Sequence, residues 1–398
     1  MEKPKIRFKG YNDAWEQRKL GEVFEEYAEK NHPELPALTI IQGGGTVRRD
    51  ESERNILYDK DNLSGYKLVR KNDFIMHLRS FEGGLEKATS DGVISPAYHT
   101  FHGVEADARF YYAYFRSYDF IKIKLVPHIY GIRDGKSIDV EGMKSIRIPY
   151  PSFAEQKKIG DYIDTLDKLI TFYQYKCDET KTLKKYMLQK MFPKDGEKVP
   201  EIRFSGFTDA WEQRKLSEVA EFSKGNGYSK GDLCATGTPI ILYGRLYTKY
   251  ETTIKEVDTF VIPKEGSVYS KGGEVIVPAS GETAEDIARA ATVENAGILL
   301  GGDLNVVTPN KDINSAFLAL SISNGGPQKE LAKKAQGKSV VHVHNEEIKG
   351  LDIAFPEREE QDRISAYFSN LDNLITLHQR KCEELQNIKK FMLQNMLI

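Results

Sequence analysis

The sequence predicts two mixed α/β (α+β) domains joined by two long helices, arranged as an internal repeat with pseudo-twofold halves. Residues 5–23, KIRFKGYNDAWEQRKLGEV, return almost unchanged as residues 201–219, EIRFSGFTDAWEQRKLSEV. Residues 151–192 return as residues 356–397, from a proline and a Glu-Gln pair at one end to MLQKMF or MLQNML at the other. The two repeated blocks therefore form a frame that the chain builds twice.

The segments enclosed by this frame, residues 24–150 and 220–355, are almost unrelated to each other in sequence. Short β-rich runs separated by glycines predict strands near residues 73–78, 145–149, 239–243 and 274–278, and helices are expected near residues 107–120 and 313–335. Each insert is therefore expected to be mixed α/β. Two unlike inserts in one frame suit a protein that reads two different things at a fixed separation.

Each copy of the second repeated block, residues 151–192 and 356–397, predicts one long amphipathic helix. In the first copy, Ile159, Ile163, Leu166 and Ile170 follow at spacings of three and four residues, which places them on one face of a helix. A run of about 37–40 residues, at ~1.5 Å per residue, would reach about 55–60 Å. Because the apolar stripe is close to a heptad, the two helices are expected to form a coiled-coil-like pair.

These patterns predict five segments. Residues 1–150 form the first domain, 151–192 the first long helix, 193–200 a linker, 201–355 the second domain and 356–398 the second long helix. Pro193 is expected to end the first helix, because proline lacks an amide hydrogen and clashes with the preceding turn.

Composition narrows the class of protein. No apolar run approaches the roughly 18–20 residues that span a bilayer, and the first residues lack the apolar core of a secretion signal. We therefore expect a cytoplasmic protein that does not associate with a membrane. The three cysteines are too few for a disulfide framework and are expected to be reduced. The net charge is −2 and neither insert is basic as a whole, so DNA binding would need local positive patches or charge from a partner.

The sequence contains only partial matches to the motifs of enzymes, so we predict no catalytic residue. Both GKS triplets, at residues 135–137 and 337–339, lack the earlier glycine of a phosphate-binding loop. His342 and His344 would point the same way on a strand and could bind a metal. However, no further ligands stand at suitable spacing, so no metal site is predicted.

Clusters of Arg, Lys, His and Tyr in the inserts are candidates for nucleic-acid contact. Arg can bond a guanine edge in bidentate fashion, whereas Lys mainly holds phosphate, and interleaved tyrosines suit a loop that faces a groove. The alternative for each residue is a solvated loop with internally paired charges. The candidates are Arg48, Arg49, His77, Arg79, Ser80, Tyr130, Arg133 and Lys136 in the first insert, and Tyr243, Arg245, Tyr247, Lys249, Ser280, Thr283, Lys334 and Lys338 in the second.

The duplicated frame, the motif DAWEQRKL at residues 13–20 and 209–216, and the two helix starts Pro-x-x-x-Glu-Gln together resemble the specificity subunit of Type I restriction–modification enzymes. The resemblance covers essentially the whole chain. It implies two target-recognition domains that each read one half of a bipartite, asymmetric site in double-stranded DNA. It also implies that the two long helices pack antiparallel as a spacer.

The resemblance further implies a subunit that performs no chemistry itself. It would recruit two methyltransferase subunits and two restriction subunits, and S-adenosylmethionine, ATP and Mg²⁺ would be bound by those partners and not by this chain. The family's base-contacting residues lie in the variable inserts, so no individual contact carries over to this sequence.

The long helices carry apolar side chains on more than one flank, and part of this surface is a candidate for docking a methyltransferase. The residues are Tyr162, Tyr186, Met187, Tyr367, Phe391 and Met392. The alternative, burial of all of them between the two helices, stays open. At the level of function, the alternative is a protein-interaction scaffold with two divergent binding domains, since the inserts are not basic.

Overall fold

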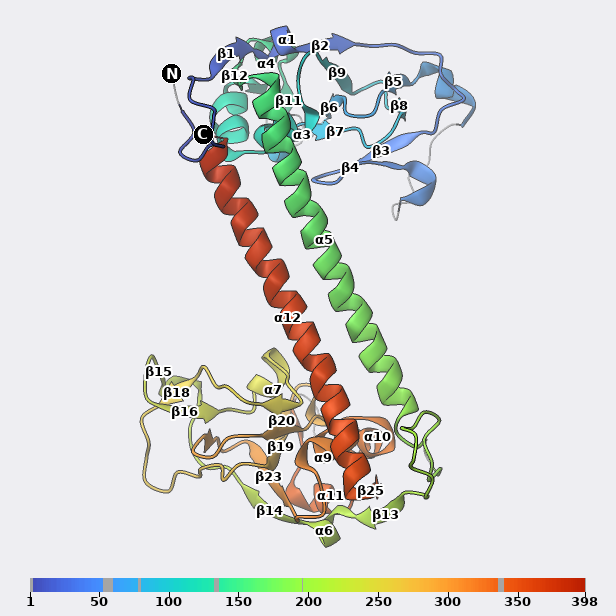
Figure 1. Cartoon of the computed structure of the whole chain (residues 1–398), viewed down its shortest axis with the longest axis vertical. Coiled ribbons are helices and arrows are strands. Elements are labelled where there is room, and N and C mark those ends of the chain that lie inside the picture. Colours follow the sequence, from blue (N-terminus) through green and yellow to red (C-terminus); the bar gives the residue numbers. More distant parts are fainter. Residues whose placement is uncertain are drawn as a thin grey trace. The chain divides into compact units, whose positions relative to one another are not determined.

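The structure is a computed structural model that describes residues 3–52, 60–77, 80–131, 136–194, 196–335 and 340–397 (Figure 1). The chain divides into two compact units, one of residues 1–173 with 381–398 and the other of residues 174–380. The long helices α5 (Phe153–Lys190) and α12 (Arg358–Met396) each begin in one unit and end in the other. The predicted fold class, mixed α/β with two long helices, is confirmed, whereas the division into five segments stays a prediction.

The first unit carries its strands and short helices between the N-terminus and α5. They are β1 (Glu16–Lys19), α1 (Leu20–Val23), β2 (Phe24–Tyr27), β3 (Leu38–Ile41), β4 (Gly45–Arg48), β5 (Lys67–Val69), β6 (Phe74–Met76), α2 (Ser80–Gly83), β7 (Glu86–Lys87), β8 (Gly92–Ile94), β9 (His99–Gly103), α3 (Ala108–Phe115), β10 (Ile129–Tyr130), β11 (Ser137–Ile138), α4 (Val140–Lys144) and β12 (Arg147–Tyr150). A π-helical stretch at Asp119–Leu125 follows α3.

The second unit places its elements between the end of α5 and the start of α12. They are β13 (Glu212–Lys215), α6 (Leu216–Val219), β14 (Ala220–Lys224), β15 (Leu233–Cys234), β16 (Thr238–Ile241), α7 (Arg245–Thr248), β17 (Thr253–Ile254), β18 (Phe260–Val261), β19 (Glu274–Pro278), β20 (Ser280–Gly281), α8 (Ala284–Ile287), β21 (Ala291–Val293), β22 (Leu299–Leu300), β23 (Leu304–Pro309), α9 (Ser315–Ile322), α10 (Gly325–Lys334), β24 (Val341–His342), α11 (Asn345–Lys349) and β25 (Asp352–Phe355).

The four predicted strand runs overlap β6, β12, β16 and β19. The helix predicted over residues 313–335 is in fact two helices, α9 and α10. Asn324 between them is extended, and Gly325 has a φ of +62°, a conformation that side-chain-bearing residues rarely adopt. The helix predicted over residues 107–120 ends earlier, at Phe115.

Both units are built on the same arrangement of four antiparallel strands, to which the second unit adds the parallel edge strand β17, although the two inserts are almost unrelated in sequence. The strand order is β2-β9-β6-β7 in the first unit and β14-β23-β19-β21-β17 in the second. The registers correspond, because Ile75 lies opposite Thr100 as Ile276 lies opposite Val306. The repeat in the sequence did not reveal this shared sheet, since its strands lie in the inserts.

The repeated motif EQRKL forms the same strand pair in both units. β1 pairs antiparallel with β12, with Glu16 opposite Tyr150, and β13 pairs antiparallel with β25, with Glu212 opposite Phe355. β12 and β25 are the strands that lead directly into α5 and α12. The start of each domain is therefore fixed to the strand that precedes a long helix.

A buried ion pair attaches the first turn of each long helix to the repeated IRF segment. Arg7 donates to the two carboxylate oxygens of Glu155 at 2.6 and 2.8 Å, and Arg203 donates to those of Glu360 at 2.6 and 2.7 Å. Both carboxylates are almost inaccessible, at 1% and 0% exposure. Hydrogen bonding to the glutamates raises the pKa of both arginines, so both guanidinium groups stay charged.

The glutamine that follows each of these glutamates joins the helix to the domain core. Gln156 Nε2 donates to the carbonyl of Pro151, and its Oε1 accepts from the backbone amide of Asp107, the N-cap of α3, both at 2.9 Å. Gln361 makes the same two bonds, to the carbonyl of Pro356 and from the amide of Asn314, the N-cap of α9, both at 2.9 Å. Both glutamines are buried, and three of these four bonds lie in the protein interior.

Each domain core also includes the end of the other long helix. In the first unit, Met396 and Leu397 pack with Trp15, and in the second Met191 packs with Trp211. Backbone hydrogen bonds make the same connection. The amide of Ile6 donates to the carbonyl of Asn395 at 3.0 Å, and the amide of Ile202 donates to the carbonyl of Lys190 at 2.9 Å.

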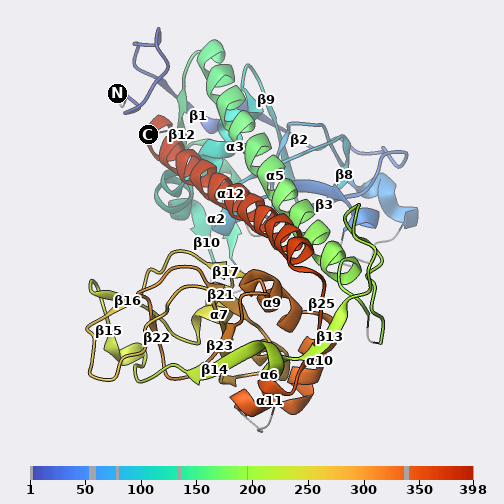
Figure 2. The ribbon, with the colours of Figure 1, turned by 60° about the horizontal axis from the view of Figure 1, so that its bottom comes forward.

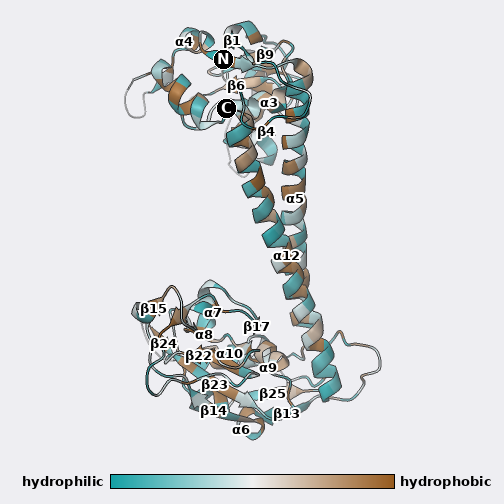
Figure 3. Ribbon diagram, turned by 60° about the vertical axis from the view of Figure 1, so that its left-hand side comes forward, coloured by the Kyte–Doolittle hydropathy of each residue, from teal (hydrophilic) through white to brown (hydrophobic). Residues whose placement is uncertain are grey.

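Within each unit the start of one long helix therefore lies beside the end of the other (Figures 1 and 2). Asp167 pairs with Lys389 in the first unit, and Asp372 pairs with Lys184 in the second, at positions that the repeat places in correspondence. The helices are thus antiparallel in both units, as the resemblance implied. Apolar and polar turns alternate along both helices (Figure 3).

Replacing Glu360 by Ala is predicted to lower the free energy of unfolding of the second unit by about 3 kcal/mol, because Arg203 would keep a largely buried charge without its partner. The transition is followed in denaturant by the fluorescence of Trp211, which is 1% exposed, in a Trp15→Phe background that removes the signal of the first unit. The control is Glu212→Ala, which breaks a surface pair with Arg214 in the same unit and should leave the transition unchanged. Equal curves for the two variants would contradict the assignment of the buried pair as an anchor.

Candidate DNA interface

Arg245, the arginine predicted to contact DNA in the second insert, lies inside the second unit. Its side chain is 7% exposed. Nη1 donates to Asp258 Oδ1 at 2.8 Å, and Nη2 donates to Glu251 Oε2 and to the Glu256 carbonyl, both at 2.8 Å. Base contact by Arg245 stays a prediction that this burial disfavours, because Nη1 and Nη2 already bind the loop that follows α7.

Other candidates near α7 are better placed at the surface. Tyr243 and Lys249 are 37% and 53% exposed and line a pocket of about 630 Å³. Tyr247 is half-buried, stands edge-on to Tyr243 with 6.0 Å between ring centroids, and donates its hydroxyl to the carbonyl of Ser280. Lys249 Nζ lies 3.0 Å from Asp258 and lowers the pKa of that carboxyl to about 2. We call Tyr243, Tyr247 and Lys249 the α7 ridge. It offers an ammonium group, which can hold phosphate, and an aromatic edge, which can pack against a base.

The remaining candidates of the second unit have local structural partners. Ser280 Oγ is 3.2 Å from His342 Nδ1 across the β20–β24 pair. Thr283 caps the N-terminus of α8. Lys334, at the end of α10, pairs with Glu330 at 2.6 Å. The Ser280–His342 contact is exposed, at a two-stranded sheet.

In the first unit, the two neighbouring arginines have different surroundings. Arg48 is 50% exposed and pairs with Asp50 at 3.1 Å, so its guanidinium remains at the surface. Arg49 donates to the carbonyl of Leu38 at 3.2 Å and lies over the ring of Tyr66, 5.3 Å from its centroid. Arg48 is therefore the better candidate for contact with DNA.

The other described candidates of this unit separate in the same way. Ser80 is fully buried and accepts a hydrogen bond from the amide of His77 at 2.9 Å, so its burial disfavours the predicted contact with DNA. Burial lowers the pKa of His77, which favours the neutral imidazole. Tyr130 is 57% exposed, and Lys136 lies 5.8 Å from the ring centroid of Phe81. Arg79, Arg133 and Lys338 lie outside the described residues.

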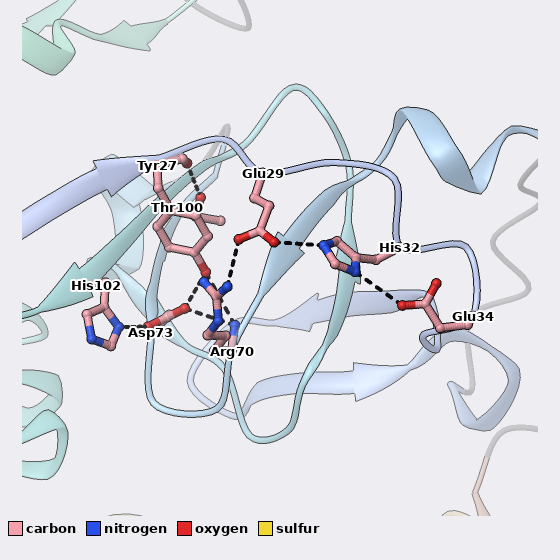
Figure 4. A network of polar contacts seen from close by, with 8 residues as sticks. All are labelled: Tyr27, Glu29, His32, Glu34, Arg70, Asp73, Thr100 and His102. Atoms are coloured by element: carbon pink, nitrogen blue, oxygen red, sulfur yellow. Dashed lines mark hydrogen bonds and ion pairs between the residues drawn. The ribbon is translucent and has the colours of Figure 1, made fainter.

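A polar network that the sequence did not single out stands on the sheet of the first unit (Figure 4). Asp73 is 1% exposed, accepts from the hydroxyl of Tyr27 and the amide of Arg70, and lies 2.7 Å from His102 Nδ1. It holds His102, whose side chain is 56% exposed, in one orientation. The sequence signal for this network was an acidic residue, Asp73, directly before the apolar strand β6. Glu274 is the equivalent acidic residue at the start of β19, where it accepts from two backbone amides.

The corresponding sheet positions of the second unit carry different groups. The pairing registers align Tyr27 with Ser223 and His102 with Thr308. The two domains therefore share a sheet and present unlike side chains on it.

The comparisons with known proteins identify the fold and the family. The family described as "Type I restriction modification DNA specificity domain" matches residues 12–179 and again residues 208–387. The chain belongs to this family.

Individual relatives agree with this result. The Type I restriction enzyme MjaVIII specificity subunit of Methanocaldococcus jannaschii is 22% identical over 273 residues, 66% of this chain and 63% of that protein. The crystal structure of a Type-I restriction-modification system S subunit from M. genitalium aligns with 100% of this chain and 99% of its own, with a TM-score of 0.62 and 12% identity. A chain from a study of assembly and conformational transition in the type I R-M system covers 97% of both chains at a TM-score of 0.50 and 17% identity. At these identities the two structures support the fold alone.

Most residues predicted to dock a partner pack against the specificity domains themselves. Tyr162 and Met392 contact the core of the first unit, and Met187 and Tyr367 contact that of the second. These contacts help to hold the helices to the domains, and the assignment of the four residues to a docking surface stays a prediction.

Tyr186 and Phe391 are 49% and 54% exposed and remain candidates for docking. Further large apolar residues on the helices were missed: Leu169, Phe172, Leu374 and Leu377 are 39%, 51%, 44% and 60% exposed. The available signal was a second apolar stripe at helical spacing, beside the one that packs inward.

Within the described ranges, no group of His, Cys, Asp and Glu could hold a metal ion. No described helix is both long enough and apolar enough to cross a membrane.

Within the second specificity domain, Arg245 and Lys249 are predicted to respond oppositely to replacement by Ala. Arg245→Ala removes the bonds that hold the loop after α7 and should cost about 2 kcal/mol of unfolding free energy. Lys249→Ala should leave stability unchanged and reduce DNA affinity, with a salt dependence smaller by about 0.9 in log–log slope for one lost phosphate contact. Denaturation and salt titration of DNA binding separate the two. A stable Arg245→Ala variant with altered base preference would restore Arg245 as a reader.

Proposed function

We propose that this chain is the DNA-sequence-specificity subunit of a Type I restriction–modification complex and reads a bipartite, asymmetric site in double-stranded DNA. Each specificity domain reads one half of the site. The subunit recruits two methyltransferase subunits and two restriction subunits in the cytoplasm. It is not itself an enzyme, and S-adenosylmethionine, ATP and Mg²⁺ bind to the partners.

The observation that carries this proposal is one frame around two unlike surfaces. The ion pairs Arg7–Glu155 and Arg203–Glu360 and the glutamine bonds are the same in both units. The side chains displayed on the sheets and loops differ, as Tyr27 and His102 differ from Ser223 and Thr308. Equal frames suit two copies of one partner, whereas unequal surfaces suit two different half-sites.

The long helices suit the role of a spacer. α5 and α12 are continuous over 38 and 39 residues, and each is anchored at its start to one domain and at its end to the other. A continuous helix is a stiff connection of about 1.5 Å per residue, so it suits a protein that fixes the distance between two half-sites.

Methylome sequencing of host cells with and without the gene tests the proposed function. We expect loss of adenine methylation at one motif made of two unlike half-sites separated by a fixed gap. Exchange of residues 24–150 for the insert of another specificity subunit should change one half-site and leave the other. A methylome that is the same with and without the gene, in cells with an active partner methyltransferase, would contradict the proposal.

The exposed apolar residues of the long helices suit two equivalent methyltransferase contacts. The first unit presents Leu169 and Phe172 of α5 with Phe391 of α12. The second presents their repeat equivalents, Leu374 and Leu377 of α12 with Tyr186 of α5. Large apolar side chains repeated in this way at the surface of helices favour a protein partner that covers them.

Replacing Phe172 and Leu377 by Ser is predicted to weaken methyltransferase binding about tenfold at each contact, because burial of each side chain contributes roughly 1.5–3 kcal/mol. The affinity is measured by titration of the purified methyltransferase. Tyr118→Ser is the control, since Tyr118 is a 75% exposed aromatic residue outside the long helices. If this control weakens binding as much as the helix variants do, the docking surface lies elsewhere.

A further inference from the structure

A groove in the second unit runs between the long helices and the specificity domain. Its volume is about 830 Å³. One wall is formed by α5 and α12 and the other by residues 250–256, which contain β17, the edge strand of the five-stranded sheet. Lys184 Nζ lies 3.4 Å from Thr252 Oγ1 at the point where the two walls meet. We call this feature the helix–domain groove.

Cations outnumber anions in the helix–domain groove. The cations are Lys181, Lys184, Lys185, Lys255 and Arg380, and the anions are Glu251, Glu256 and Asp372. Lys184 pairs with Asp372, Lys255 lies 3.5 Å from Glu294, and Glu251 pairs with Arg245.

Lys181, Lys185 and Arg380 are exposed and form no ion pair with any described residue. Three positive side chains with no ion-pair partner among the described residues therefore line one groove, beside the polar side chains of Asn373, Thr376 and Gln379. The groove is also lined by Leu377, which is proposed above to contact a methyltransferase.

The internal repeat provides a comparison for these three cations. The positions that correspond to Lys181, Lys185 and Arg380 hold Gln386, Lys390 and Tyr175. The neighbouring ion pair is retained, because Asp167–Lys389 corresponds to Asp372–Lys184. The anchoring charges are thus duplicated, and the unpaired charges are concentrated in one half.

We propose that the helix–domain groove binds the phosphodiester backbone of DNA next to the half-site that the second domain reads. Lys181, Lys185 and Arg380 contact phosphates, and the neighbouring amide and hydroxyl groups add hydrogen bonds. Lysine suits this role, since it holds phosphate as a point charge without reading sequence. The inference rests on the proposed function and adds a DNA contact outside the domain surfaces that read bases.

The asymmetry of the charges favours DNA over a protein occupant. Two copies of one methyltransferase would meet the same groups in both halves, yet two of the three cations are absent from the other half. By contrast, DNA with two unlike half-sites is itself asymmetric, so it can meet different groups in the two halves of the chain. The wall of the groove formed by residues 250–256 begins directly after Lys249, so the groove adjoins the α7 segment along the chain.

The test uses the complex of the full chain with its methyltransferase and the triple variant Lys181→Gln/Lys185→Gln/Arg380→Gln. The log–log salt dependence of DNA binding should decrease by about 2–3, close to 0.9 for each lost phosphate contact. Affinity should fall equally for DNA with and without the recognition site, and the methylated motif should not change. Ethylation interference should be lost at phosphates beside the second half-site only.

The single variants Lys185→Gln and Lys390→Gln form a matched pair at corresponding positions. Lys185→Gln should reduce the salt slope by about one, and Lys390→Gln should leave it unchanged. Equal effects of both, an unchanged slope in the triple variant, or loss of methyltransferase binding by the triple variant would each overturn the inference. The wild-type complex tests the proposed function separately from the groove. If it fails to bind or methylate a bipartite site, the proposed function is wrong, whatever the variants do.

Discussion

The buried Glu-Gln pair at the start of each long helix is the constraint on which the rest of the structure depends. The glutamate holds the IRF segment through Arg7 or Arg203, and the glutamine holds the N-cap of α3 or α9. Four pieces of chain, the N-terminal segment, the strand before the helix, the domain helix and the long helix, are thus joined within one helical turn. An ion pair in such a buried site is stabilising only when its hydrogen bonds offset the loss of hydration, and each of these glutamates accepts two from its arginine.

The sequence predicted the parts of the fold that the frame determines. The duplicated blocks predicted two domains and two long helices, because an apolar stripe at helical spacing needs no knowledge of its partner. The shared sheet was not predictable, because its registers depend on contacts between strands far apart in the chain, such as Phe24 with Gly103. The break between α9 and α10 was also missed, since Gly325 is compatible with either a helix interior or a helix end.

The candidate site was less predictable than the fold, and Arg245 shows why. An arginine among tyrosines and glycines fits a groove-facing loop and a buried anchor equally well. The difference lies in Glu251 and Asp258, whose approach to the guanidinium is a tertiary contact. The same holds for Tyr162 and Phe391, which have similar places in the helix pattern. The first packs on the domain core and the second is 54% exposed.

The chemistry of the anchor also explains how one frame can carry two unlike inserts. The oxygen of Gln156 accepts from the backbone amide of Asp107, and that of Gln361 from the backbone amide of Asn314. A backbone amide is present whatever the side chain, so the bond asks only that a helix begin there, which Asp and Asn both allow. The arginine, the glutamate and the strand EQRKL all belong to the frame. The insert must therefore supply a sheet and a helix start of the right geometry, while its surface side chains stay free to differ. Such independence is what a protein needs if the way it assembles is to stay constant while the sequence it reads changes.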